Sequence, residues 1–338
     1  MIQVEHLTKC YGDFMAVHDL SFEIEEGHVY GFLGPNGAGK STTMNIMTGC
    51  LSATSGRVLI DGHDIFEEPK EAKRLLGYLP EQPPLYLNES PEEYLTFVGR
   101  AKGLRGQELR EQVAEVMTQT GIVPVRNRRI SDLSKGYRQR VGIAQALLGN
   151  PKVIILDEPT VGLDPIQIIE IRDLIRELGR SHTVIFSSHI LSEVQAICDR
   201  ILIIARGQLI AFDRPENLER QLLGQNEITL TTRAGEDEVL DILFPLDVGE
   251  EVSFQKKENG LTQVHLKTPD PDPYAMSERL FWAFADGGVA LLEMSLKKAS
   301  LEDVFLELTE DKEEPEESQE REDDQDLADE DEQEVDEV

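Results

Sequence analysis

The sequence predicts an α/β protein in which a mainly parallel sheet is flanked by helices. The apolar run 28–34 is typical of a buried strand, and it leads through a glycine-rich loop into a helix-forming run at 40–48. Further apolar runs follow, and the later ones alternate with helical runs, as parallel strands joined by helices do. The further expected strands are 57–60, 153–157, 183–187 and 201–205. The helical runs expected between the later strands are 165–178 and 192–198.

Residues 90–150 interrupt this alternation, and we expect them to form a mostly helical insert. Ser90 is followed by Pro91 and Glu93, which is the pattern of a capping box with proline at the first helical position. A second helical run covers 108–120. The first domain, residues 1–216, is therefore expected to carry this insert within its sheet.

After residue 216 the composition changes, and residues 217–310 are expected to form a small α+β domain. Asn259-Gly260 marks a hairpin turn within it. The expected strands are 227–232, 251–256, 262–267 and 289–295, and the expected helices are 237–243 and 273–285.

The end of the chain is an acidic tail. Residues 311–338 contain 17 acidic and two basic residues, nearly half of the net charge of −32. With almost no apolar side chains to bury, the tail is expected to be disordered. It either solvates the protein without a specific partner, or it docks on a partner or senses cations.

Charge and hydropathy exclude several classes of protein. The net charge of −32 argues against a nucleic-acid partner, because phosphate backbones are bound through Lys and Arg. The longest apolar runs, such as 153–156 and 201–205, are far shorter than the roughly 20 residues of a membrane helix. Residues 1–5 show no basic start or apolar run of a secretory signal, so we expect the chain to be cytoplasmic.

The glycine-rich loop after the first buried strand matches Gly-x-x-x-x-Gly-Lys-Ser, a loop whose backbone N–H groups bind phosphates at a helix N-terminus. Lys40 is assigned to the β- and γ-phosphates of a nucleotide and Ser41 to Mg²⁺. The residues expected to bind the nucleotide here are Gly34, Pro35, Asn36, Gly37, Ala38, Gly39, Lys40, Ser41 and Thr42.

The apolar strand at 153–156 ends in two carboxylates, Asp157 and Glu158. The first can enter the shell of a Mg²⁺ ion and the second can activate water as a general base. An acidic pair after a strand is also common as a solvated strand end. The pair therefore indicates Mg²⁺ binding and base catalysis only when it is considered together with the phosphate-binding loop.

Together with further segments in the same order, these motifs resemble the ATP-binding cassette (ABC) ATPases. Leu133 to Arg140 resembles the family signature, and Leu163-Asp164 its aspartate loop. Gln82 lies at the position of the glutamine loop, His189 matches the switch histidine, and Tyr11 matches the aromatic residue that stacks on adenine. The resemblance covers residues 2 to about 215. It implies a P-loop NTPase cassette with an antiparallel β edge.

The resemblance also implies a mechanism that two cassettes share. A second copy, or a related cassette subunit, binds head to tail, so that Ser134 and Gly136 reach the γ-phosphate bound by the partner and Asp164 contacts the facing subunit. The implied catalytic residues are Lys40, Gln82, Glu158 and His189, and the implied Mg²⁺ ligands are Ser41, Gln82 and Asp157.

The signature departs from the commonest form, Leu-Ser-Gly-Gly-Gln, at Lys135 and Tyr137. A cation at position 135 either attracts ATP across the interface or points into solvent. Ser134 and Gly136, which face the phosphate in the family, are retained.

This variant signature, the small domain and the closing run 300–309 resemble one branch of the family, the cassettes of exporters that pair with a separate membrane permease. The resemblance places the subunit on the inner face of the plasma membrane. Leu85, Tyr86 and Leu87 then either contact the permease or pack the insert against the sheet. Two rival interpretations are a soluble ABC ATPase acting on ribosomes or DNA and a catalytically silent scaffold.

Overall fold

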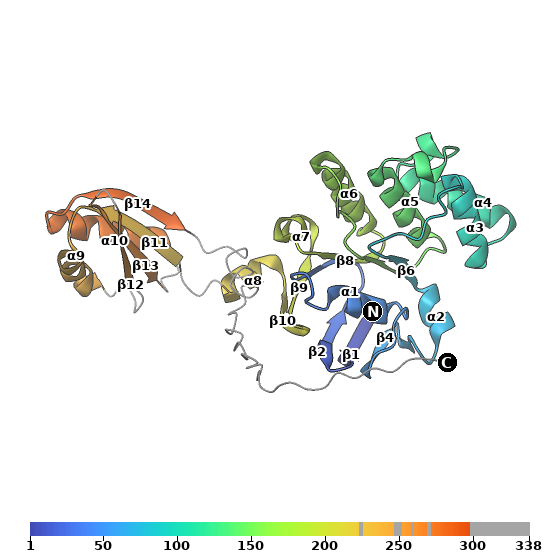
Figure 1. Ribbon diagram of the computed structural model, residues 1–338, viewed down its shortest axis with the longest axis horizontal. Helices are drawn as coiled ribbons and strands as arrows, with labels where there is room; N and C mark the ends of the chain where they lie inside the picture. The colour runs from blue at the N-terminus through green and yellow to red at the C-terminus, as the bar shows by residue number, and fades with distance from the viewer. Residues whose placement is uncertain (223–225, 247–251, 258–259, 269–271, 298–338) are drawn as a thin grey trace, which may run out of the picture.

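The computed structural model describes residues 1–222, 226–246, 252–257, 260–268 and 272–297, and the expected disorder of the tail 311–338 falls outside these ranges. The first unit contains the elements up to α8, and the second contains β11 to β14 (Figure 1). In the described ranges no helix has the length and apolar character needed to cross a membrane.

The centre of the first unit is a six-stranded sheet, which confirms the predicted mainly parallel arrangement. Five of its strands are parallel, and β10 pairs antiparallel with β9 at one edge. The order across the sheet is β10 (Gln208–Asp213), β9 (Arg200–Ala205), β3 (Val29–Leu33), β8 (Thr183–Ser188), β7 (Val153–Leu156) and β6 (Leu76–Leu79).

A second, four-stranded sheet supplies the expected antiparallel edge. Its strands lie in the order β2 (Phe14–Ile24), β1 (Ile2–Tyr11), β4 (Ser55–Ile60) and β5 (His63–Asp64). The strand expected at 57–60 is β4 of this sheet, where it pairs antiparallel with β1.

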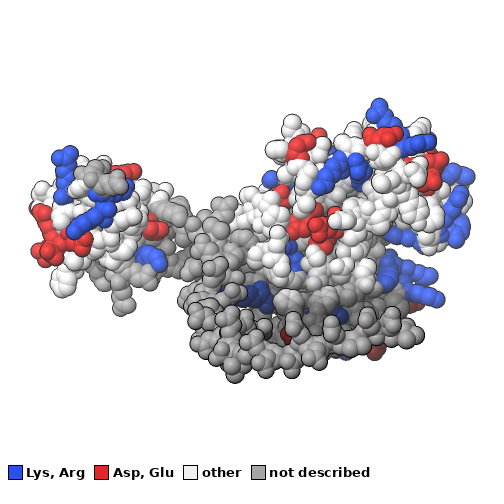
Figure 2. All heavy atoms as spheres, viewed as in Figure 1, with Lys and Arg blue, Asp and Glu red and all other residues white. Residues whose placement is uncertain are grey.

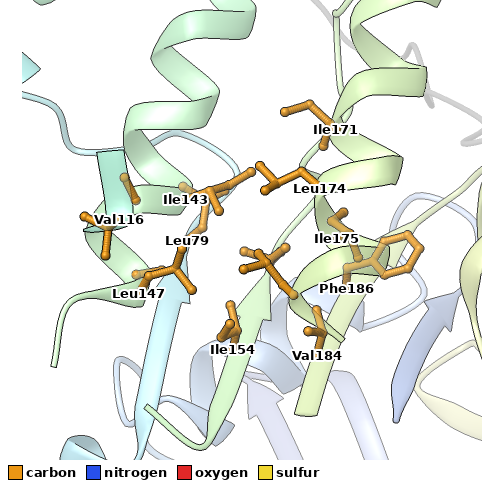
Figure 3. Packing of buried hydrophobic residues seen from close by; sticks show 14 of the residues in the cluster. Leu79, Val116, Ile143, Leu147, Ile154, Ile171, Leu174, Ile175, Val184 and Phe186 are labelled. Atoms are coloured by element: carbon orange, nitrogen blue, oxygen red, sulfur yellow. The ribbon is translucent and has the colours of Figure 1, made fainter. Parts of the chain in front are cut away.

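Both faces of the parallel sheet are covered, which explains why β7 is apolar at every position. Ile154 and Leu156 belong to the core cluster on one face, whereas Val153 and Ile155 belong to the cluster on the other face. On the first face, strand residues such as Ile154 meet side chains from the helical insert and from α6 (Pro165–Leu178) (Figure 3). The second face packs against α1 (Lys40–Met47) and the antiparallel sheet.

Between β6 and β7 the chain forms the predicted helical insert. Its N-terminal capping box is present, because the Ser90 N–H donates to Glu93 Oε2 at 2.9 Å and Ser90 Oγ accepts from the Glu93 N–H. The insert consists of α3 (Pro91–Ala101), α4 (Gly106–Gln119), the short 3₁₀ helices Val123–Val125 and Ile130–Asp132, and α5 (Lys135–Leu147). The remaining helices of the first unit are α2 (Pro69–Arg74), α7 (Leu191–Ile197) and α8 (Pro215–Leu222). Helix α8 runs across the expected domain boundary after residue 216.

The second unit has the β-α-β-β-α-β order of a ferredoxin-like fold. Its sheet has the strand order β12-β13-β11-β14, and all pairs are antiparallel. Gly260 has a φ of 75° beside the expected hairpin turn, while Asn259 lies outside the described residues. The elements are β11 (Asn226–Thr232), α9 (Glu236–Leu243), the 3₁₀ helix Phe244–Leu246, β12 (Val252–Lys256), β13 (Thr262–Thr268), α10 (Pro273–Asp286) and β14 (Leu291–Lys297).

Candidate functional site

The predicted site residues follow the carboxyl ends of neighbouring parallel strands. The phosphate-binding loop follows β3, Asp157 and Glu158 follow β7, and His189 follows β8, which lies between β3 and β7 in the sheet. In open parallel sheets the loops at the carboxyl ends gather on one side, which is where ligands bind. The sheet therefore brings together residues that are more than 100 positions apart in the sequence.

The glycines of the loop are required by its close approach to neighbouring backbone. A Cβ on Gly34 would lie 2.3 Å from the carbonyl oxygen of Ile204, and one on Gly39 would lie 2.5 Å from that of Ala16. Gly39 also has a φ of 99°, a conformation that side chains rarely adopt. These glycines let the loop wrap tightly before α1 begins at Lys40.

The Lys40 side chain lies buried within its own loop. Its ammonium donates to the carbonyl oxygens of Gly34 at 2.8 Å and Pro35 at 3.2 Å. It also lies 3.4 Å from Glu158 Oε1, with both side chains more than nine-tenths buried. A buried cation is therefore held at the N-terminus of α1, where backbone N–H groups also favour an anion.

Asp157 faces the first turn of α1. Its Oδ1 accepts hydrogen bonds from Ser187 Oγ at 2.6 Å and from Ser41 Oγ at 3.2 Å. Burial raises the pKa of the Asp157 carboxyl above its usual range, and these two hydroxyl groups offset part of that rise. Two oxygen donors suited to a hard cation thus lie side by side at the loop.

Glu158 is placed by its backbone and by three neighbours. Its N–H donates to Ser187 Oγ at 2.8 Å, and its φ of 47° turns the residue into the left-handed region. One carboxylate oxygen faces Lys40, and the other lies 3.0 Å from His189 Nδ1. Non-glycine residues in this backbone region are uncommon and cluster at functional sites.

A cavity of about 490 Å³ opens over the loop and gathers residues from all of these segments. Tyr11 and Phe14, which flank the β1–β2 turn, line one side and are 49% and 64% exposed. The remaining lining residues are Ala16, the loop residues from Pro35 to Thr42, Glu81, Glu158, Val161 and His189. The cavity combines an aromatic wall with a phosphate-binding loop, as a nucleotide requires.

The structure does not place Gln82 among the residues that line this cavity. Gln82 is exposed after β6, and its neighbour Glu81 lines the cavity instead. The expected catalytic and metal-binding roles of Gln82 therefore stay predictions.

Ser134, Gly136 and Asp164 line a separate cavity of about 440 Å³. Ser134 caps α5 by accepting from the Tyr137 N–H, and Asp164 caps α6 by accepting from the Gln167 N–H at 2.9 Å. Two helix N-termini therefore meet at this cavity, away from the phosphate-binding loop of the same chain.

Lys135 packs against its own chain. A Cβ built on Gly162 would lie 2.2 Å from Lys135 Nζ, so the ammonium covers this glycine just before Asp164. The Lys135 residue is exposed as well, so an orientation toward solvent agrees with the structure, and its attraction to ATP across the interface stays a prediction.

Besides Glu81, the motifs do not reveal Ser187 and Phe14 as contributors to the site. Ser187 bonds both acidic residues, but a serine near a strand end carries no specific signal. Phe14 shares the aromatic wall with Tyr11, and its signal was an apolar side chain beside the Gly12-Asp13 turn.

Comparison with known proteins agrees with this geometry. The ABC transporter family model matches residues 17–161. The chain is 37% identical to the uncharacterized ABC transporter ATP-binding protein YhcH of Bacillus subtilis, over 93% of this chain and 98% of that protein. It is 33% identical to the bacitracin transport ATP-binding protein BcrA of Bacillus licheniformis, over 91% of this chain and 97% of that protein.

Solved structures give the same result over about two thirds of the chain. A dimeric ATP-binding cassette in a post-hydrolysis state, bound to ADP and Pi, is 27% identical and superposes with a TM-score of 0.58, covering 63% of this chain and 98% of that one. An ATP-binding subunit of an ABC transporter is 29% identical, with a TM-score of 0.59 over 65% of this chain and 92% of that one. This chain belongs to the family of ABC transporter ATP-binding proteins.

Proposed function

We propose that this protein is the ATP-hydrolysing subunit of an ABC transporter, that it dimerises on ATP, and that it drives a separate membrane permease, for export. The observation that carries the proposal is the convergence of Lys40 and His189 on one buried carboxylate, Glu158, beside the phosphate-binding loop. Full-length similarity to the bacitracin transport ATP-binding protein supports a transport role.

ATP binding requires recognition of both phosphates and base. The backbone N–H groups from Gly37 to Ser41 and the Lys40 ammonium supply positive partners for the β- and γ-phosphates. Tyr11 supplies an exposed ring on which adenine stacks. Both features line the same cavity.

The residues beside Lys40 fit a Mg²⁺ ion that accompanies ATP. Ser41 Oγ and Asp157 Oδ1 are hard oxygen donors 3.2 Å apart, and Mg²⁺ usually binds through one or two carboxylates, phosphates and water. The ion, when bound, would neutralise charge on the phosphates. We include Gln82 as a third contact on family resemblance alone.

Glu158 is positioned to act as the general base in hydrolysis. It accepts a proton from the attacking water, while His189, 3.0 Å from its Oε2, orients the carboxylate and contacts the γ-phosphate. The Lys40 ammonium lies 3.4 Å from the other carboxylate oxygen, Oε1, and forms an ion pair with it inside the buried site.

The second cavity supports a head-to-tail dimer. Ser134 and Gly136 lie at the N-terminus of α5, where an anion is favoured, yet they line a cavity separate from the phosphate-binding loop of their own chain. We infer that they complete the site of a partner subunit, and that Asp164 contacts that partner.

The helical insert carries the surface that we assign to the permease. Tyr86 and Leu87 are each 50% exposed, and the Tyr86 ring packs 5.2 Å from that of Phe97, whereas Leu85 packs against the core. Basic side chains gather over the end of the molecule where α3 and α4 lie (Figure 2). A groove of about 490 Å³ between these helices is lined by Leu109, Val113, Met117, Val123, Arg100, Arg105, Arg110 and Arg126, among others.

The division into a cassette of residues 1–216, an accessory domain of 217–310 and an acidic tail of 311–338 is part of this proposal. So is a cytoplasmic location on the inner face of the plasma membrane. The separate apolar core of the second unit, which includes Leu230 and Phe284, supports the accessory domain.

Capture of the permease tests the transport role. The Glu158→Gln variant, loaded with Mg-ATP, is used to pull down partners from membranes of the native host. We expect an integral membrane protein with several spanning helices. Recovery of ribosomes instead, with no membrane protein, would favour the soluble ABC ATPase.

A further inference from the structure

A buried carboxylate outside the catalytic cavity connects two of its loops. Glu193 lies on α7 and is only 3% exposed. Its Oε2 accepts hydrogen bonds from Thr160 Oγ1 at 2.7 Å and from Ser188 Oγ at 3.0 Å. A carboxylate is costly to bury unless hydrogen bonds compensate it, so these two contacts define its environment.

One of these hydroxyl groups, that of Ser188, belongs to the loop that presents His189. Ser188 ends β8 directly before His189, and its Oγ also accepts from the Ile190 N–H at 3.0 Å. Ser188 therefore contacts the backbone on the far side of the histidine and links it to Glu193. The position of the His189 ring depends on this short turn.

The other hydroxyl group, that of Thr160, belongs to the segment between the general base and the aspartate loop. Thr160 is 5% exposed and lies two residues after Glu158 and four before Asp164. The Glu158 N–H is fixed at the start of this segment by Ser187 Oγ at 2.8 Å. The hydrogen bond from Thr160 to Glu193 holds the part of this segment that lies between Glu158 and Asp164.

A simpler role for Glu193 would be to stabilise α7, since an acid in the first turn interacts favourably with the helix N-terminus. An exposed acid would serve that purpose equally well. It would not require burial or two hydroxyl donors from different loops. Both donors bond to the same oxygen, so the carboxylate acts as a bridge between the loops.

We propose that Glu193 is a positioning residue that couples the His189 loop to the Thr160–Asp164 segment. His189 faces the nucleotide of its own subunit, and Asp164 faces the partner subunit. The Glu193 carboxylate keeps both loops in one arrangement, so that contact with the partner and contact with the γ-phosphate change together. This inference rests on the proposed roles of His189 and Asp164.

Steady-state ATP hydrolysis by purified full-length variants tests the bridge. We expect Glu193→Ala to lower kcat about 10-fold or more, by analogy with residues that orient metal ligands, whose loss typically costs 10- to 100-fold, and to leave KM for ATP within about two-fold. Glu193→Gln retains an acceptor oxygen and should lie between wild type and Glu193→Ala. Ser192→Ala, an exposed neighbour on the same helix, is the matched control and should match wild type.

Substitution of Thr160, the hydrogen-bond partner of Glu193, tests whether Glu193 acts through this bond or only stabilises the fold. Thr160→Val removes the hydroxyl at nearly constant volume and should lower kcat in the same way, whereas Thr160→Ser should retain it. The double variant Glu193→Ala with Thr160→Val should be no slower than the slower single variant, because both remove one shared bond. If Glu193→Ala does not fold, Glu193→Gln and the Thr160 variants still decide the question.

All rates are compared per folded molecule, below the unfolding midpoint of every variant. A kcat equal to wild type in folded Glu193→Ala, or fully additive losses in the double variant, would overturn the proposed role of Glu193 and leave the proposed function intact. A wild-type chain that does not hydrolyse ATP would overturn both.

Discussion

His189 Nδ1 lies 3.0 Å from Glu158 Oε2, joining the end of β8 to the end of the neighbouring strand β7. The opposite oxygen of the same carboxylate lies 3.4 Å from the Lys40 ammonium, which belongs to the loop after β3. The buried Glu158 carboxylate, which follows β7, therefore contacts residues that follow β3 and β8. This arrangement makes Glu158 the residue through which the loops of the site are connected.

Replacing Glu158 by Gln should abolish turnover and retain ATP binding. The amide keeps the size of the side chain but cannot accept the proton of the attacking water, and loss of a general base typically costs 10²- to 10⁴-fold. Binding of a fluorescent ATP analogue and release of phosphate measure the two effects, and size-exclusion chromatography should show an ATP-bound dimer.

The matched control for this change is Glu177→Gln, an exposed acid on α6 that pairs with Arg180. It should hydrolyse ATP at the wild-type rate. Hydrolysis by Glu158→Gln at a rate close to wild type would refute the assignment of the base.

Replacing Asp157 by Asn should stabilise the fold and impair Mg²⁺-dependent hydrolysis. Burial raises the pKa of Asp157 in the folded chain above its unfolded value, so the charged form destabilises the fold at pH values above the folded pKa. Thermal unfolding without nucleotide at pH 7 should show a midpoint about 2 °C or more above wild type.

The pH dependence of this difference is the decisive measurement. As the pH falls through the folded pKa of Asp157, the wild-type carboxyl becomes neutral and the advantage of Asn should shrink. Asp173→Asn, an exposed acid paired with Arg176, should show no such pattern. An advantage that grows on acidification would contradict the predicted direction.

Replacing Tyr11 by Ala should weaken ATP binding. Loss of a stacked aromatic ring costs about 1–3 kcal/mol per base, so KM for ATP should rise about 10-fold with little change in kcat. Tyr11→Phe retains the ring and serves as the control.

Phe14→Ala decides between the two aromatic side chains of this wall. If Phe14→Ala raises KM and Tyr11→Ala does not, the adenine stacks on Phe14 and the role inferred for Tyr11 is wrong.

Ending the chain at Glu310 should leave ATP hydrolysis by the purified protein unchanged. All residues with an assigned role in catalysis or in positioning catalytic residues lie before residue 194, and residues 311–338 contribute mainly negative charge. Phosphate release by the shortened and full-length chains at equal protein concentration measures this. A loss of turnover of 10-fold or more would mean that the tail takes part in the cycle.

The sequence alone determined the parallel sheet and the identity of its catalytic loops. The apolar runs before Gly34 and Asp157 have no polar alternation, which indicates strands covered on both faces, and the motif residues follow such strands directly. Loops that follow parallel strands all lie at the carboxyl ends of those strands, on the same side of the sheet. Local pattern therefore predicted that Lys40 and Glu158 belong to one site, and the resemblance to the ABC ATPases added His189.

Only the tertiary structure decided the contacts between segments that are distant in sequence. The cover of Lys135 over Gly162, the place of Glu81 rather than Gln82 at the cavity, and the bridge from Glu193 to Thr160 depend on how helices and loops pack. No residue type or spacing signals such contacts, because each arises from side-chain direction after packing. The sequence therefore identifies the catalytic groups, and packing determines which groups hold them in place.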